Sequence, residues 1–86
     1  MSNTLLKEAD LRDVIAVDTN FQDANLYGSN LSRANMTDSN LNGADLRFAD
    51  LFQTNFAQAD MVNAKINNTD AKWGNFVGTY LSGANL

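Results

Sequence analysis

The chain has no cysteine, no histidine and no proline among its 86 residues. Without cysteine it has neither a disulfide framework nor thiol chemistry. Without histidine it lacks the commonest general base and a common metal ligand. It has no glycine-rich phosphate loop, no apolar run of membrane-spanning length and no secretory pattern near Met1. We therefore expect a soluble cytoplasmic protein that is not an enzyme and holds no cofactor or metal.

The charge of the chain is low, with six basic and ten acidic residues and a net charge of −4. This balance disfavours binding to nucleic-acid backbones and to anionic membranes. Winding the chain in coils of twenty residues would place Asp18 above Asp38 and Asp50 above Asp70. Such pairs could bind a cation or act in acid–base chemistry. We attribute them instead to the residue preferences of a repeat, because neither pair indicates a pocket.

An apolar residue recurs at every fifth position without a change of phase. The seventeen positions are Leu6, Leu11, Ala16, Phe21, Leu26, Leu31, Met36, Leu41, Leu46, Leu51, Phe56, Met61, Ile66, Ala71, Phe76, Leu81 and Leu86. The residue two places earlier is small, and the residue just before is Asn or Asp in thirteen of the seventeen repeats. A period of five matches neither the stripe of an amphipathic helix nor the two-residue period of a straight strand.

Within one repeat the residues alternate as in a short strand. In Ala44-Asp45-Leu46 the small residue and the leucine face one way and the carboxylate faces the other. The next two residues break the alternation, which indicates a corner. Corners of about a right angle would close a coil every four repeats, and stacked coils would form an all-β solenoid. We expect Leu31, Leu41, Leu46, Leu51 and Phe56 to be almost fully buried, and the outward Asn42 to tolerate substitution.

Segments such as 24–28, 44–48 and 49–53 resemble the pentapeptide-repeat family, whose consensus is a small residue, Asp or Asn, Leu or Phe, a polar residue and often Gly. The resemblance covers residues 9–86. It implies a right-handed quadrilateral β-helix, here of about four coils. It also implies that four glycines lie at corners, where unusual backbone angles are tolerated. These glycines are Gly28, Gly43, Gly78 and Gly83.

We interpret residues 1–86 as a single repeat domain, with 1–8 as an N-terminal cap or lead-in and 9–86 as repeats. The ends depart from the pattern. Ala16 and Ala71 are small central residues, Lys65 and Tyr80 replace Asn or Asp, and Gly74 takes the small position. A solenoid needs covered ends. Leu5 and Leu6 are candidates to fold over the first coil. Phe76, Leu81 and Leu86 would be exposed on the last coil, which predicts end-to-end association of copies through that coil or a chain cut from a longer one.

Aromatic residues interrupt the polar outward positions. Residues twenty-one apart lie on a diagonal between coils, which pairs Tyr27 with Phe48 and Phe52 with Trp73. Residues twenty apart stack, which places Arg47 under Tyr27 and Lys72 under Phe52. We expect the four rings to converge around one corner. One interpretation is that the rings only cover each other and stabilise the coils. The other is a docking patch for a protein partner, formed by Tyr27, Arg47, Phe48, Phe52, Lys72 and Trp73.

The leading hypothesis is a non-catalytic interaction or scaffold module that binds an unknown protein partner. The alternative comes from the family resemblance: some pentapeptide-repeat proteins mimic DNA, bind DNA gyrase and confer quinolone resistance. Such mimicry needs a continuous acidic strip. In this chain Arg12, Arg33, Arg47 and Lys72 interrupt the outward acids, and Asp13 is expected to form an exposed ion pair with Arg33.

Overall fold

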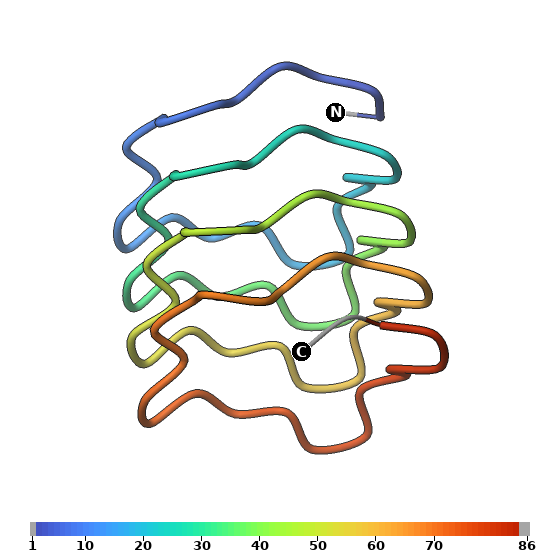
Figure 1. Cartoon of the computed structure of the whole chain (residues 1–86). Coiled ribbons are helices and arrows are strands. Elements are labelled where there is room, and N and C mark those ends of the chain that lie inside the picture. Colours follow the sequence, from blue (N-terminus) through green and yellow to red (C-terminus); the bar gives the residue numbers. More distant parts are fainter. Residues whose placement is uncertain (1, 85–86) are drawn as a thin grey trace.

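The computed structural model describes residues 2–84, which form a repeat β-solenoid. The chain winds through stacked coils, with its first coil at one end of the stack and its last coil at the other (Figure 1). Residues 2–84 contain isolated β-bridges and turns, without a helix or a longer strand. Parallel bridges join residues twenty apart, from Leu5 with Asn25 to Asp60 with Tyr80. One coil therefore takes four repeats, the coil length that the sequence predicts.

Backbone hydrogen bonds run in both directions between neighbouring coils. The N–H of the central Met36 donates to the carbonyl of Asn55 at 2.7 Å, and the N–H of Asn55 donates back to the carbonyl of Ala34 at 2.9 Å. The same pattern recurs along the stack, so each interior coil is bonded to the coil on either side. Stability therefore depends on contacts between neighbouring coils, as in other solenoids.

A turn closes each corner. At one of them the N–H of Ala24 donates to the carbonyl of Phe21 at 3.0 Å. The last residue of every described repeat has a positive φ, from Asn3 at 57° to Gly83 at 70°. The four glycines predicted at corners all adopt this conformation, which confirms that prediction. Thirteen other corners place a residue with a side chain there, where an L-amino acid is disfavoured.

The Asn or Asp that precedes each central residue has a structural role in these turns. Its side-chain oxygen accepts a hydrogen bond from the N–H two residues later. Examples are Asn25 with the N–H of Tyr27 at 3.1 Å and Asp50 with the N–H of Phe52 at 3.0 Å. Asn and Asp are the residues that make this local turn bond. The turn bond therefore explains why the repeat prefers them at this position.

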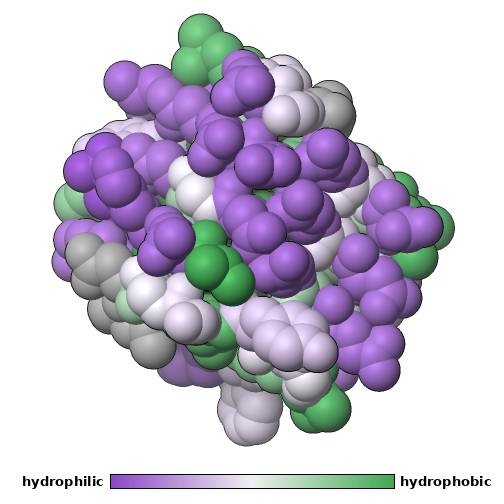
Figure 2. All heavy atoms as spheres, turned by 90° about the vertical axis from the view of Figure 1, so that its right-hand side faces the viewer, coloured by the Kyte–Doolittle hydropathy of each residue, from purple (hydrophilic) through white to green (hydrophobic). Residues whose placement is uncertain are grey.

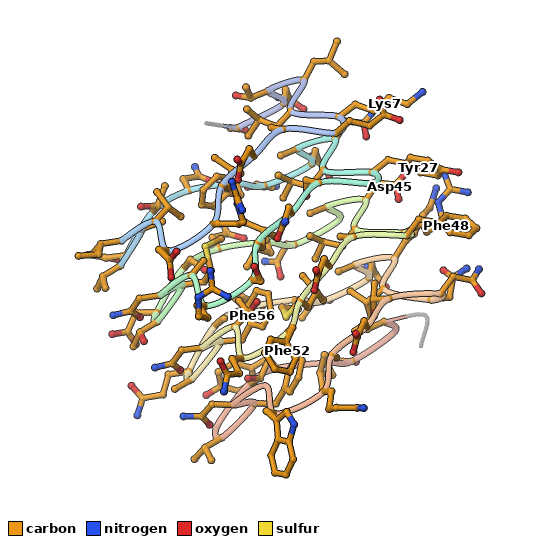
Figure 3. The ribbon with its side chains drawn as sticks, turned by 90° about the vertical axis from the view of Figure 1, so that its left-hand side faces the viewer. Lys7, Tyr27, Asp45, Phe48, Phe52 and Phe56 are labelled. Carbon is orange, nitrogen blue, oxygen red and sulfur yellow. The ribbon has the colours of Figure 1, made fainter. Side chains whose placement is uncertain are left out.

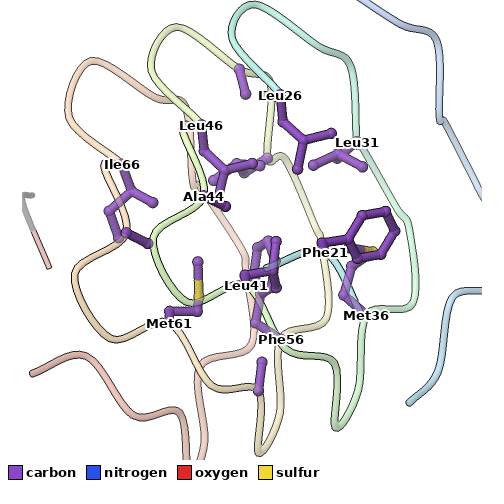
Figure 4. Packing of buried hydrophobic residues seen from close by; sticks show 14 of the residues in the cluster. Phe21, Leu26, Leu31, Met36, Leu41, Ala44, Leu46, Phe56, Met61 and Ile66 are labelled. Carbon is purple, nitrogen blue, oxygen red and sulfur yellow. The ribbon is translucent and has the colours of Figure 1, made fainter. Parts of the chain in front are cut away.

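The core is a column of central side chains surrounded by small residues (Figure 4). The five residues predicted to be buried are at most 1% exposed, which confirms the prediction. Alanines such as Ala44 and Ala59 are also fully buried, together with Ser39 and Thr54. The Thr54 hydroxyl donates to the carbonyl of Leu31 at 2.8 Å, so a polar residue is accommodated in the small position.

The prediction that Asn42 tolerates substitution is wrong in its premise. Its side-chain oxygen accepts a hydrogen bond from the N–H of Val62, one coil away, at 2.8 Å. At the equivalent corners the oxygen comes instead from the residue two places before the N–H, which here is Asp60. The Oδ1 atom of Asp60 is buried and has no partner within residues 2–84. Asn42 therefore joins two coils and is not a freely solvated side chain.

The N-terminal residues continue the coil and do not fold over it. Leu5 bridges Asn25, and the N–H of Leu6 donates to the carbonyl of Asn25 at 2.8 Å. Leu5 is therefore an outward residue, 73% exposed, so the expectation that it covers the first coil is wrong. Leu6 is partly buried and packs against the core. At the other end Phe76 and Leu81 are only partly buried, whereas Leu86 lies outside the described residues.

The outer walls are mostly polar. The wall in Figure 2 is largely hydrophilic, and its apolar side chains appear as separate spots. Exposed apolar residues of the chain include Ile15, Val17 and Val77. Scattered residues of this kind are normal on a protein surface. No helix among residues 2–84 has the length and apolar character needed to cross a membrane.

Candidate protein-interaction surface

Four side chains gather at the corner that follows Leu26 and its neighbours in the stack. We name this group, Lys7, Tyr27, Arg47 and Phe48, the Tyr27 corner. The ring centroids of Tyr27 and Phe48 are 5.3 Å apart with an interplanar angle of 49°. The Arg47 guanidinium lies 5.3 Å and the Lys7 ammonium 5.4 Å from the centre of the Tyr27 ring. Both cations are within the range of an attractive interaction with the ring.

Asp45 holds the Arg47 side chain in place. Nε of Arg47 donates to Oδ1 of Asp45 at 2.9 Å, and a terminal nitrogen donates to Oδ2 at 2.7 Å. These hydrogen bonds lower the pKa of Asp45 and raise the pKa of Arg47. A two-point bond of this kind fixes the orientation of the guanidinium plane. Asp45 therefore positions the cation beside the Tyr27 ring.

Phe48 combines exposure with an unfavourable backbone. Its side chain is 56% exposed, and its φ is 62°, in the left-handed region. All described corners share this conformation, and at twelve others it is also adopted by a residue with a side chain. The equivalent residue one coil earlier is Gly28, which has a φ of 68°. The fold therefore supplies a position suited to glycine, and this chain places a largely exposed aromatic ring there.

The other predicted aromatic residues are not brought into contact with the Tyr27 corner. Figure 3 shows Phe52 well away from the column of Lys7, Tyr27 and Phe48. Within the described residues the aromatic pairs are Tyr27–Phe48 and Phe56–Phe76, and the cations over rings both face Tyr27. The expectation of one convergent patch is wrong because the second set lies one repeat later. One side of the coil separates the two corners.

Phe52, Lys72 and Trp73 lie at the next corner without pairing there. Phe52 is half-buried and its N–H is bonded to Asp50, whereas Trp73 is 75% exposed with a φ of 62°. Lys72 uses its backbone N–H to bond the carboxylate of Asp70 at 3.1 Å. The predicted residues thus divide into a clustered group and a dispersed group.

Sequence reasoning missed two contributors to the Tyr27 corner. Lys7 lies twenty residues before Tyr27, the same spacing that placed Arg47 beside the ring. Asp45 was assigned only to the repeat's own Asn or Asp position. Its turn geometry directs it to a residue two places later, which here is an arginine. The twenty-residue spacing could have identified Lys7.

The family model Pentapeptide repeats (8 copies) matches residues 4–43 and 39–76. The chain belongs to the pentapeptide-repeat family. Solved structures of two pentapeptide repeat proteins are similar to this chain over nearly its whole length. Among curated proteins, no sequence matches it.

One similar structure is HetL, from the cyanobacterium Nostoc, a pentapeptide repeat protein involved in the regulation of heterocyst differentiation. It is 20% identical with a TM-score of 0.69, and the match covers 98% of this chain and 47% of HetL. The other comes from the thylakoid lumen of Arabidopsis thaliana. It is 26% identical with a TM-score of 0.59, and the match covers 99% of this chain and 66% of that protein. This chain thus spans about half of HetL, and at 20% identity the likeness to HetL shows the fold alone.

QnrB1, a plasmid-mediated fluoroquinolone resistance protein, is more distant. It is 16% identical with a TM-score of 0.45, over 93% of this chain and 46% of that one. A similarity this weak supports no functional argument. The alternative hypothesis of DNA mimicry and gyrase binding therefore stays an untested prediction.

Charged residues elsewhere on this pentapeptide-repeat chain form local pairs. Arg33 donates to Asp13 across one coil at 2.8 and 3.1 Å, which confirms the predicted ion pair. This bond lowers the pKa of Asp13 and raises that of Arg33. Both side chains are about half exposed, so the pair contributes little to stability.

The predicted carboxylate pairs do not form a larger cluster. Asp50 and Asp70 are neighbours across a parallel bridge, each turned toward the N–H two residues later in its own coil. Within the described part of the chain, no group of three or more acidic side chains is placed to hold a metal ion. Each of these two carboxylates therefore serves its own turn.

Proposed function

We propose that this chain is a non-catalytic module that binds a protein partner through the Tyr27 corner. The proposal includes the finer fold description: a right-handed four-sided coil of about four turns with flat walls that carry the docking surface. The observation that carries the functional proposal is Phe48, a largely exposed ring held at a φ of 62° beside Tyr27. Every described corner shares this backbone conformation, so what distinguishes this one is an exposed ring paired with a second ring that two cations face.

The chemistry of the corner suits a protein partner. Aromatic rings and arginine are the side chains most enriched at the centres of protein interfaces. The Tyr27 ring is already half-buried between two cations, so it loses little conformational freedom when a partner binds. Arg47 is likewise oriented in advance by Asp45. The exposed part of Phe48 remains available to enter an apolar pocket on the partner.

The competing interpretation is that the rings only stabilise the stack. An aromatic pair contributes about 0.5–1.5 kcal/mol beyond its burial. A residue forced into the left-handed region costs about 1–2 kcal/mol. The two effects are similar in size and opposite in sign at Phe48. The net contribution of Phe48 to stability is therefore close to zero, which leaves its exposed ring available to a partner.

Phe48→Gly separates the two interpretations. Glycine adopts this φ without strain, so the free energy of unfolding should stay within about 1 kcal/mol of the wild type. If the corner docks a partner, the substitution should remove partner binding all the same. Gln53→Gly is the matched control, because Gln53 occupies the same repeat position one corner later with a φ of 57°. It should leave binding unchanged.

The measurement is quantitative mass spectrometry of proteins retained from the source organism's lysate by the immobilised variants. Calorimetric titration of each variant with the purified retained protein follows. The proposal requires a protein that the wild type and Gln53→Gly retain and Phe48→Gly loses. Equal retention by all three variants would refute it. A fall in melting temperature for Phe48→Gly with unchanged affinity would assign the corner a structural role. Trp73→Gly, tested in parallel, shows whether the second corner contributes.

A further inference from the structure

The two outermost described coils leave rows of backbone groups without partners. In the first coil, the N–H and carbonyl groups of Asp10, Ile15 and Asn20 make no backbone hydrogen bond within residues 2–84. In the last coil, another set of backbone N–H and carbonyl groups likewise makes no backbone hydrogen bond within residues 2–84. These are the N–H groups of Ala71, Phe76 and Leu81 and the carbonyl groups of Thr69, Gly74 and Thr79. Within residues 2–84 both coils therefore present an open β-edge, which favours pairing with another chain.

The two edges are complementary to each other. Inside the stack, a coil uses the N–H of its central residue and the carbonyl of its small residue toward the coil that follows. That following coil uses the carbonyl and N–H of the residue before its centre, as with Met36, Ala34 and Asn55. The open edge of the last coil carries unpaired N–H groups of central residues and unpaired carbonyl groups of small residues. The open edge of the first coil carries the unpaired N–H and carbonyl groups of the residues before the centres, which are the groups that bond to them inside the stack. Two identical edges could meet only antiparallel, whereas every described bridge is parallel.

The side chains at the two ends also fit. The last coil has a pocket of about 400 Å³ lined by Leu51, Ile66, Thr69, Ala71, Phe76 and Leu81. The first coil presents Leu6 and Leu11, which are only partly buried. One coil further in, the equivalent Leu26 and Leu31 are completely buried. A leucine from the first coil of a second copy would fill the pocket as Leu26 and Leu31 fill the interior.

The charges of the two end coils have opposite sign. Side chains of residues 2–21 include four carboxylates and two cations, a net charge of −2. Those of residues 65–84 include Lys65, Lys72 and a single carboxylate, a net charge of +1. Opposite charges favour contact between unlike ends and oppose contact between two first coils.

We propose that the last coil of one copy, residues 65–84, binds the first coil of a second copy, residues 2–21, head to tail. This inference is independent of the Tyr27 corner. Such a contact leaves one open edge on each outer copy, so association continues and does not close at a dimer. The 86-residue chain should therefore form short stacks whose mean mass rises with concentration.

Two single-end substitutions test the polarity of the contact. Leu81→Asp places a charge in the open face of the last coil, and Leu11→Asp places one in the open face of the first. Each variant alone should sediment as a monomer at all concentrations. An equimolar mixture should form a one-to-one dimer and nothing larger, because one compatible pair of edges remains. Association between like ends would instead leave one of the two variants able to dimerise alone.

Circular dichroism and thermal unfolding show whether these two variants fold. A second pair of variants avoids the core. Lys65→Gln with Lys72→Gln should weaken association roughly fivefold at low salt, because two favourable charges are lost. Gln53→Glu with Gln58→Glu changes the net charge by the same amount away from the ends and should have a smaller effect. A monomeric wild-type chain at every concentration, or a mixture of folded end variants that stays monomeric, would overturn the proposal.

Discussion

Leu46→Ala tests whether the column of central residues holds the solenoid together. Leu46 is 0% exposed and lies between Leu26 and Ile66 along the stack (Figure 4). Its N–H donates to the carbonyl of Lys65 at 2.7 Å, so its coil is tied to the next one. The hydrogen-bonded ladder keeps the coils at strand spacing, about 4.8 Å, and limits collapse around the lost side chain. A cavity should therefore remain.

The expected cost is in the upper part of the range for buried leucines, about 3–5 kcal/mol of unfolding free energy. For a domain of this size a loss of 3 kcal/mol lowers the melting temperature by roughly 12–24 °C. Leu6→Ala is the matched control. It removes the same atoms from the same column, but Leu6 is partly buried in the end coil. Its cost should be about 1–2 kcal/mol, because a partly exposed side chain loses less on truncation.

Urea unfolding followed by far-ultraviolet circular dichroism gives both free energies. Fluorescence of Trp73, the single tryptophan, should report the same midpoint if the stack unfolds as one unit. Equal costs for Leu46→Ala and Leu6→Ala would refute the reasoning, because burial depth would then not decide stability. A cost below about 1 kcal/mol for Leu46→Ala would show that the coils collapse around the cavity.

Two further predictions concern polar groups. Arg47 lowers the pKa of Asp45, so this pair stabilises the fold above the ordinary carboxyl pKa of 3.8, and the contribution is lost as the pH falls through the lowered folded value. The melting temperature of Asp45→Asn should therefore fall less than that of the wild type as the pH is lowered. Parallel curves of melting temperature against pH for the two proteins would contradict this. Asn42→Ala should cost about 1 kcal/mol in urea unfolding through its lost hydrogen bond between coils. Gln22→Ala, at the equivalent outward position, should cost less. Equal costs for the two substitutions would contradict the stabilising role of the Asn42 hydrogen bond.

Much of the fold could be predicted from the sequence because the five-residue period leaves few solutions. A large apolar residue at every fifth position and a small one two places earlier can share a core only if the chain turns within each repeat. The burial of Leu31, Leu41 and Phe56 followed from this constraint. The twenty-residue stacking also placed Arg47 beside Tyr27 and Asp13 beside Arg33. These predictions needed only the register of the coils.

Tertiary structure decided what happens at the outward positions. The same diagonal spacing produced a ring contact between Tyr27 and Phe48 but none between Phe52 and Trp73. The bond from Asn42 to the next coil and the two-point bond from Arg47 to Asp45 were equally hidden in the sequence. The physical reason is that core positions are specified by volume and register, which repeat with the sequence. An outward side chain takes its direction from the local turn and from its neighbours one coil away.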